Sequence, residues 1–226
     1  MTVSGAVAFG TTLCGGAAPS GQAVTLSNQT NVAYPYTWAF SSGLDYSATD
    51  VGRGTVPANG VATIVVTPIG ATFGPGALPG SAPYADDLVV TVATSPPTRL
   101  TVPLSWTLDG AVLSLPQGAG PSMDASGDAF YVADSTSGFP LPMDNTGTAP
   151  VTVDFAIQPA GELTFSPPGP IQVIPGIRAA PELTSTSSAA ACPLLTSGTV
   201  TFVYTGPVCQ PFPLPQVSVK ACVGTF

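Results

Sequence analysis

The sequence predicts an all-β protein made of two tandem immunoglobulin-like β-sandwiches. Apolar and polar residues alternate along much of the chain, which is the two-residue period of half-buried strands and not the period of helices. Pro (26 residues) and Gly (25 residues) recur between the alternating runs and provide turn signals. The apolar fraction of 44% is sufficient for a buried core, so a disordered chain is excluded.

The first sandwich is predicted over residues 1–108. Its clearest strand is Leu100–Trp106, in which every second residue is apolar, and Leu88–Val92 alternates in the same way before it. The short segment Ser95–Thr98 between these two runs predicts a hairpin turn. Other alternating runs are centred on Val7 and Phe9, on Val24 and Leu26, on Tyr36, Trp38 and Phe40, and on Ile64 and Val66. About seven short strands in this length are typical of an immunoglobulin-like sandwich.

The second sandwich is predicted over residues 109–226, because the pattern of the first half is repeated there. The segment Asn28–Phe40 aligns without a gap with Asn145–Ile157 at an offset of 117 residues (145 minus 28), which indicates an internal duplication. Two later runs, Val200–Tyr204 and Val217–Val223, predict a terminal hairpin. Because Ala111–Pro116 can open the second sandwich directly, almost no flexible linker is expected.

Two segments of the second half do not alternate in this way. Residues 117–137 are rich in Gly, Ser and Asp around a short apolar run, and are interpreted as an inserted loop that adds an edge hairpin and offers a contact element. The segment Ala179–Ala191 is the only one compatible with a helix, but its Ser and Thr content favours a surface loop or a single turn. Little helix is therefore expected anywhere.

Charge restricts the partners that this chain can have. Only 7% of residues are charged, and 12 acidic residues against four basic ones give a net charge of -8. The four bases, Arg53, Arg99, Arg178 and Lys220, are scattered, so the sequence predicts no basic patch for nucleic acid or an anionic membrane. No apolar run reaches the ~18 residues of a membrane helix, so membrane insertion is not expected. A surface with few ions to desolvate is instead suited to packing against copies of itself.

The sequence offers no constellation for catalysis. The chain has no His, so the usual nucleophile–base triads cannot form. The adjacent carboxylates Asp86 and Asp87 are interpreted as residues at the start of a strand, and the spacing of Asp124, Asp128 and Asp134 matches no calcium loop. We therefore predict no enzyme activity, no metal and no cofactor.

Cysteine spacing favours disulfides over a metal site, because the four cysteines lack a C-x-x-C pair and no His could complete a zinc site. Cys192, Cys209 and Cys222 are the disulfide candidates, with Cys192 bonded to either Cys209 or Cys222. Cys14 is then left to pair between domains, to pair between molecules or to stay free. These alternatives remain open at the level of the sequence.

Four segments of the first half resemble the ASH-type immunoglobulin-like modules, a group that includes abnormal spindle and hydin proteins, relatives of major sperm protein, and repeats of bacterial surface proteins. They are Val7–Gly15, Val24–Thr30, Pro57–Ile64 and Leu100–Ser105, and Phe139–Thr148 resembles the same family in the second half. After Ser166 the second half departs from the pattern and lacks the Pro-Ala-Asn-Gly turn. The resemblance implies a non-catalytic binding or structural module and brings no catalytic residues.

These features predict a structural subunit of an extracellular or cell-surface assembly, such as a fibre, filament or surface layer, built by self-association into a homo-oligomer or polymer. No signal peptide is visible at Met1–Ala6. One alternative is an adhesive or ligand-binding surface module that recognises a glycan or a protein. A second alternative is a phage virion decoration protein, for which reduced cysteines are expected.

Overall fold

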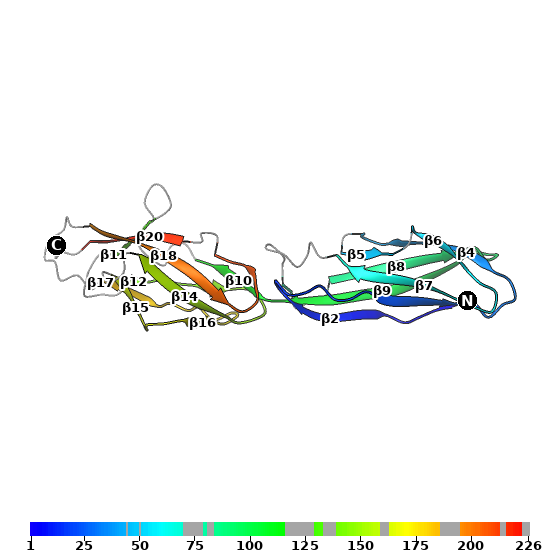
Figure 1. Cartoon of the computed structure of the whole chain (residues 1–226), viewed down its shortest axis with the longest axis horizontal. Helices are drawn as coiled ribbons and strands as arrows, with labels where there is room; N and C mark the ends of the chain where they lie inside the picture. Colours follow the sequence, from blue (N-terminus) through cyan, green and yellow to red (C-terminus); the bar gives the residue numbers. More distant parts are fainter. Residues whose placement is uncertain are drawn as a thin grey trace. The chain divides into compact units, whose positions relative to one another are not determined.

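A computed structural model describes residues 1–43, 45–49, 51–69, 79–80, 84–115, 129–132, 139–158, 163–185, 195–212 and 216–222. The chain divides into two compact units, Met1–Asp109 (unit 1) and Gly110–Phe226 (unit 2), which are labelled by their strands in Figure 1. Over these described ranges every regular element is a strand and none is a helix. The predicted all-β sandwich class is confirmed.

Unit 1 is built from two sheets. The four-stranded sheet has the order β1-β3-β7-β5 and consists of β1 (Thr2–Val3), β3 (Gln22–Ser27), β7 (Val61–Pro68) and β5 (Tyr46–Ala48). The five-stranded sheet has the order β2-β9-β8-β4-β6 and consists of β2 (Val7–Leu13), β9 (Thr98–Asp109), β8 (Tyr84–Val92), β4 (Tyr34–Phe40) and β6 (Arg53–Val56).

Alternation along these strands builds the core of unit 1. In β9, Val102, Leu104 and Trp106 are buried while the residues between them are more exposed, as the two-residue period predicts. The Trp106 ring stacks on Tyr84 of β8 with ring centroids 4.2 Å apart. The predicted hairpin is confirmed, because β8 and β9 pair antiparallel up to the Val92–Thr98 partners on either side of the turn.

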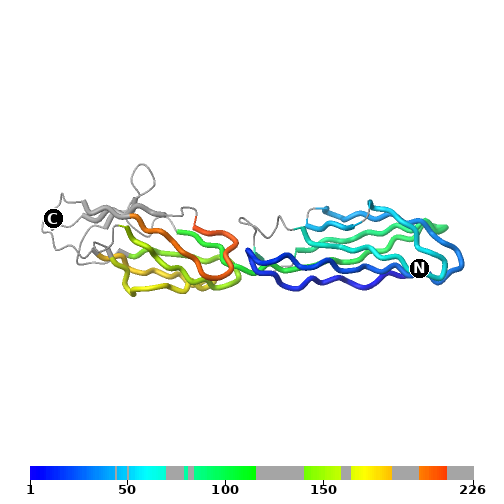
Figure 2. Tube along the Cα trace, in the orientation of Figure 1, coloured from blue at the N-terminus to red at the C-terminus, as the bar shows by residue number. Residues whose placement is uncertain are grey.

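The first two strands of unit 1 belong to different sheets. β1 pairs antiparallel with β3, whereas β2 pairs parallel with β9, and Figure 2 shows the blue N-terminal trace beside the green trace of β9. The register between β2 and β9 shifts between Ala8 and Thr11, where Gly10 has a positive φ of 77°. Since glycine adopts such a φ without steric penalty, Gly10 allows the irregularity in this edge strand.

Unit 2 contains a second five-stranded sheet with the order β11-β20-β18-β14-β16. Its strands are β11 (Ala129–Val132), β20 (Gln216–Cys222), β18 (Leu195–Thr205), β14 (Val151–Gln158) and β16 (Ile171–Val173). Two three-stranded sheets complete the unit. One is β12-β17-β15, formed by β12 (Phe139–Pro140), β17 (Glu182–Ser185) and β15 (Leu163–Ser166), and the other is β13-β10-β19, formed by β13 (Asp144–Asn145), β10 (Ala111–Ser114) and β19 (Val208–Gln210).

The five-stranded sheets of the two units have the same topology. In each, the third strand of the sheet pairs antiparallel with both neighbours, and the first strand pairs parallel with the second, as β2 does with β9 and β11 with β20. β4 and β14 are each the fourth strand of their sheet. The sequence alignment at an offset of 117 residues also matches these two strands. The sheet topology therefore agrees with an internal duplication.

One expectation for unit 2 needs correction and one stays a prediction. Within residues 117–137 the structure describes one edge strand, β11, which has the place of β2. The other residues of this segment lie outside the described ranges, so the predicted edge hairpin is not tested. The segment Ala179–Ala191 is not only a loop, because it contains β17, which pairs with β15 and buries Leu183 at 2% exposure. Its single buried apolar residue among Ser and Thr gives too little alternation to be read as a strand.

Candidate functional site

A buried asparagine organises one end of each sandwich. In unit 1 the Asn28 side-chain amide donates to the backbone oxygens of Val32 (2.7 Å) and Pro57 (2.8 Å), and its Oδ1 atom accepts from the backbone N–H of Thr30 (3.0 Å). In this way the amide fixes the turn after β3 and the end of β6. With 3% of its surface exposed, Asn28 has no room for an attached glycan, although Asn28–Thr30 is a formal sequon.

Asn145 makes the equivalent bonds in unit 2. Its amide donates to the backbone oxygens of Ala149 (2.9 Å) and Val173 (3.1 Å), and its Oδ1 atom accepts from the backbone N–H of Gly147 (2.9 Å) and of Val112 (3.1 Å). Ala149 and Gly147 lie four and two residues after Asn145, as Val32 and Thr30 do after Asn28. Val173 ends β16, and Pro57 follows the last residue of β6. The two asparagines therefore have a structural role, and they strengthen the evidence for duplication.

Asp86 is buried in the structure, at 8% exposure, and its carboxylate binds the turn that follows β4. It accepts from the Ser42 backbone N–H (2.9 Å), the Ser42 hydroxyl (2.8 Å), and the backbone N–H groups of Gly43 (3.2 Å) and Asp87 (2.8 Å). Burial raises the pKa of Asp86, but these hydrogen bonds together outweigh burial and lower it. The carboxylate is thus a structural anchor, in agreement with the non-catalytic interpretation.

The most distinctive surface of unit 1 is the outer face of its five-stranded sheet. The strand register places four exposed residues in one row across β9, β8, β4 and β6: Arg99 is opposite Thr91, Thr91 is opposite Thr37, and Thr37 is opposite Arg53. Three strand spacings of ~4.8 Å separate the Arg99 and Arg53 backbones, so two threonine hydroxyls lie between two guanidinium groups. We call this set the arginine row.

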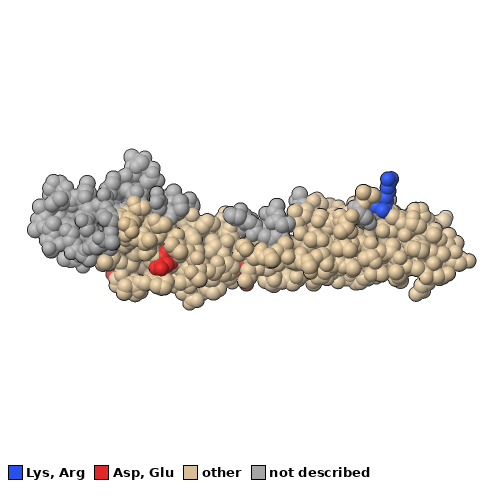
Figure 3. Space-filling view, in the orientation of Figure 1, with Lys and Arg blue, Asp and Glu red and all other residues tan. Residues whose placement is uncertain are grey.

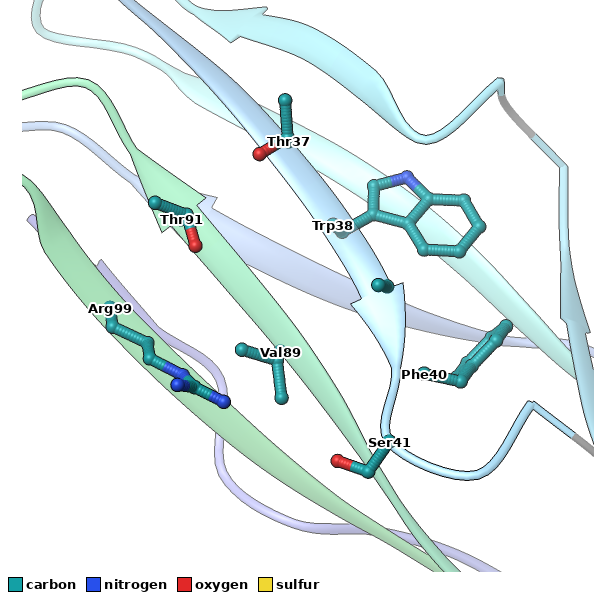
Figure 4. Close-up of a pocket in the computed structure, with 8 residues that line it drawn as sticks. Thr37, Trp38, Phe40, Ser41, Val89, Thr91 and Arg99 are labelled. Carbon is teal, nitrogen blue, oxygen red and sulfur yellow. The ribbon is translucent and has the colours of Figure 1, made fainter.

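A shallow hollow of 300 Å³ adjoins the arginine row on this face. Its lining includes Thr37, Ala39, Val89, Thr91 and Arg99. Figure 4 shows the Arg99 side chain extending past Val89, while the rings of Trp38 and Phe40 lie on the other side of β4. A neighbouring hollow of 200 Å³ shares Thr37 and Thr91 with the first. The face is therefore concave beside the arginine row and is lined by short apolar and hydroxyl side chains.

Among the residues that the structure describes, no acidic side chain forms a salt bridge with Arg53 or Arg99. In the described part of the chain the salt bridge is between Arg178 and Asp144 of unit 2, at 2.8 Å. Asp87 faces the same side as Thr91 but is four residues along β8, roughly 13 Å away. Over the described surface visible in Figure 3, charged side chains are sparse. The sequence analysis did not bring Arg53 and Arg99 together, because only the strand register does so.

Cys14 and Cys209 are both disulfide-bonded and buried, at 5% and 0% exposure. Cys14, which the sequence left without a defined role, is therefore oxidised. Cys192 lies outside the described residues, and Cys222 is the last residue of β20.

No group of three or more His, Cys, Asp or Glu that could hold a metal ion occurs in the described ranges, and Asp124, Asp128 and Asp134 lie outside them. The described ranges contain no helix that is long and apolar enough to cross a membrane.

Comparisons with known proteins give no family. No family model matches the chain, and no curated protein matches it. Solved structures that match include an MSP-domain protein of Caenorhabditis elegans, SSP-19, at 22% identity over 39% of this chain and 88% of that one, with a TM-score of 0.30. The YadV chaperone matches at 15% identity over 97% and 98% of the chains, with a TM-score of 0.38. The two immunoglobulin domains of DIP-gamma match at 11% identity over 100% and 98%, with a TM-score of 0.37.

None of these structures is specific to ASH modules, so that resemblance stays a prediction. Because the TM-scores are below 0.5 and the identities below 25%, nothing about a ligand, partner or activity of this chain follows from them.

Proposed function

We propose that this chain is a non-catalytic structural subunit of an extracellular or cell-surface assembly, and that it assembles with copies of itself through the faces of its sandwiches. The observation that carries this proposal is the outer face of the five-stranded sheet of unit 1, which is exposed, concave and poor in charge apart from the arginine row. Short Thr, Ala and Val side chains lose little conformational entropy and few bound waters when covered. Arginine is also among the residues enriched in protein interfaces.

Disulfide chemistry supports the location. Disulfides form and persist mainly in oxidising compartments, and Cys14 and Cys209 are both disulfide-bonded. This supports an exported protein over the virion alternative, for which reduced cysteines are expected.

An adhesive or ligand-binding module is the second candidate function. The observation in its favour is the 300 Å³ hollow, in which a guanidinium, hydroxyl groups and an apolar floor occur together, as they do in sites that orient a small polar ligand. A glycan or a protein loop would then occupy the hollow, and the isolated monomer would bind it saturably.

Light scattering of the purified protein over a wide concentration range, together with negative-stain electron microscopy, separates the two functions. Structural self-association predicts a mass that grows with concentration and extended or lattice-like particles. A constant monomeric mass at every concentration contradicts the structural proposal and leaves the ligand-binding module to be tested with glycan and protein arrays.

A further inference from the structure

The five-stranded sheet of unit 2 carries the opposite charge at the place of the arginine row. Asp154 of β14 is at the place of Thr37 of β4, since 154 minus 117 is 37. It is exposed, and its cross-strand partner on β18 is Val203, as Thr91 is the partner of Thr37. At this matched pair of positions, unit 1 has two threonines and unit 2 has an acidic residue beside an apolar one.

Asp154 has no cation to neutralise it within the described residues. Its carboxylate accepts from the backbone N–H of the next residue, Phe155, at 2.9 Å. The one described salt bridge of unit 2 uses Asp144 and Arg178. Asp154 in unit 2 and both arginines of the arginine row in unit 1 are consequently exposed charges that are available for a partner.

The outer faces of the two five-stranded sheets also differ in surface shape. Val203 is 52% exposed, which is high for a large apolar side chain, and it stands directly beside Asp154 on the neighbouring strand. On the unit 1 face a hollow, which Val89 and Ala39 line together with threonine side chains, lies directly beside Arg99. The protruding Val203 beside a carboxylate thus has a counterpart in a partly apolar hollow beside a guanidinium.

We propose that the outer face of the unit 1 sheet binds the outer face of the unit 2 sheet of a second copy of this chain, with Arg99 and Arg53 facing Asp154 and with Val203 in the hollow. This inference rests on the proposed function and specifies its interface. Because the two surfaces are different, the contact is heterologous, and each molecule keeps one free face of each kind. Repetition of the contact therefore produces an open polymer or a ring.

Two charge-reversal variants test the interface by complementation. Variant A carries Arg53→Glu and Arg99→Glu, and variant B carries Asp154→Arg. Each variant loses one face and keeps the other, so each alone is expected to be monomeric, with association weakened by roughly tenfold or more. An equimolar mixture is expected to regain polymer growth, as measured by sedimentation velocity, because the unchanged faces of A and B bind each other and their two charge-reversed faces are also complementary.

Further variants keep this test decisive. The triple variant, which combines all three reversals in one chain, is expected to recover polymer growth. Glu182→Lys, an exposed charge reversal on β17 in the other layer, is the matched control and is expected to assemble like the wild type. Circular dichroism checks that every variant is folded, and since all four positions are exposed, changes in stability of only ~0.5 kcal/mol are expected.

The outcomes are distinguishable from a failure of the proposed function. If the wild type assembles and variants A and B assemble equally well, the interface is wrong and the structural function stands. If the wild type is monomeric at all concentrations, the function and the interface both fail. If only one of the two variants loses assembly, the contact joins two like faces and the heterologous interface is wrong. If variants A and B are both monomeric and their mixture is monomeric too, the two faces do not bind each other and the interface is again wrong.

Discussion

Asn28 and Asn145 each satisfy several backbone groups with a single buried amide, so they are sensitive positions. Asn28→Ala leaves the Val32 and Pro57 oxygens and the Thr30 N–H without this partner. We expect a loss of roughly 2–4 kcal/mol in the free energy of unfolding, because each unsatisfied buried polar group costs about 1–3 kcal/mol. Both tryptophans, Trp38 and Trp106, belong to unit 1, so urea unfolding followed by tryptophan fluorescence measures this loss directly.

The exposed Asn31 provides the control, because Asn31→Ala should leave the urea midpoint almost unchanged. Asn145→Ala should give a loss of similar size in unit 2, which circular dichroism detects. Equal midpoints for Asn28→Ala and Asn31→Ala would show that the buried amide does not stabilise unit 1.

Asp86 should make the stability of unit 1 depend on pH. Its pKa is lower in the folded state than the ordinary value of ~3.9 in an unfolded chain, so its contribution is present above that value and is lost as the pH falls through the folded pKa. We expect Asp86→Asn to lower the melting temperature at pH 7 and to flatten the acid limb of its pH profile. A variant with the wild-type profile between pH 2 and pH 7 would contradict this role.

At the scale of residues, the sequence predicted only part of what the buried polar side chains do. It placed Asn28 and Asn145 at matching positions and excluded a catalytic role for Asp86. It could not predict their hydrogen bonds, because Asn28 and Pro57 are 29 positions apart, and Asp86 and Ser42 are 44 apart. Contacts at such separations follow from the topology and not from local sequence pattern.

At the scale of elements, Gly147 controls how closely the turn after β13 approaches β10. A Cβ atom at Gly147 would meet the Gly110 carbonyl oxygen and would lie 2.6 Å from the Val112 backbone nitrogen. Backbone atoms cannot move aside as a flexible side chain can, so Gly147→Ala should destabilise unit 2 by at least ~2 kcal/mol. The measurement is the thermal transition by circular dichroism. Gly5→Ala is the control, because a Cβ at Gly5 meets nothing within 4 Å, and equal effects of the two changes would contradict this account.

The strands that the sequence predicted best are long and central. β8 and β9 bury several residues each, so their alternation is unambiguous. The edge strands β6 and β16 contain four and three residues and bury one apolar side chain each, Val56 and Val173, which is too little for a periodic signal. The arginine row could not be predicted for a related reason. Arg53 becomes a neighbour of Thr37 only through the pairing of the short strand β6 with β4, and that pairing has no clear signal in the sequence.

At the scale of the whole molecule, the cysteines define a covalent connectivity that can be mapped. Cys14 is the only cysteine among residues 1–109, and it is disulfide-bonded, as is Cys209. Each of these two cysteines therefore has a disulfide partner. We expect proteolysis without reductant to release Cys14 and Cys209 only in disulfide-linked peptides, and mass spectrometry identifies the partner of each. Release of either cysteine in a peptide with a free thiol would contradict this prediction.

The most direct test of the central claim, that this chain is a structural subunit which assembles with itself, is sedimentation velocity of the natively folded wild-type protein over a series of concentrations. The account predicts that species heavier than the 22.5 kDa monomer appear and grow as the concentration rises, and that added salt shifts them back because the contact is partly ionic. A single 22.5 kDa species at every concentration and salt would contradict it.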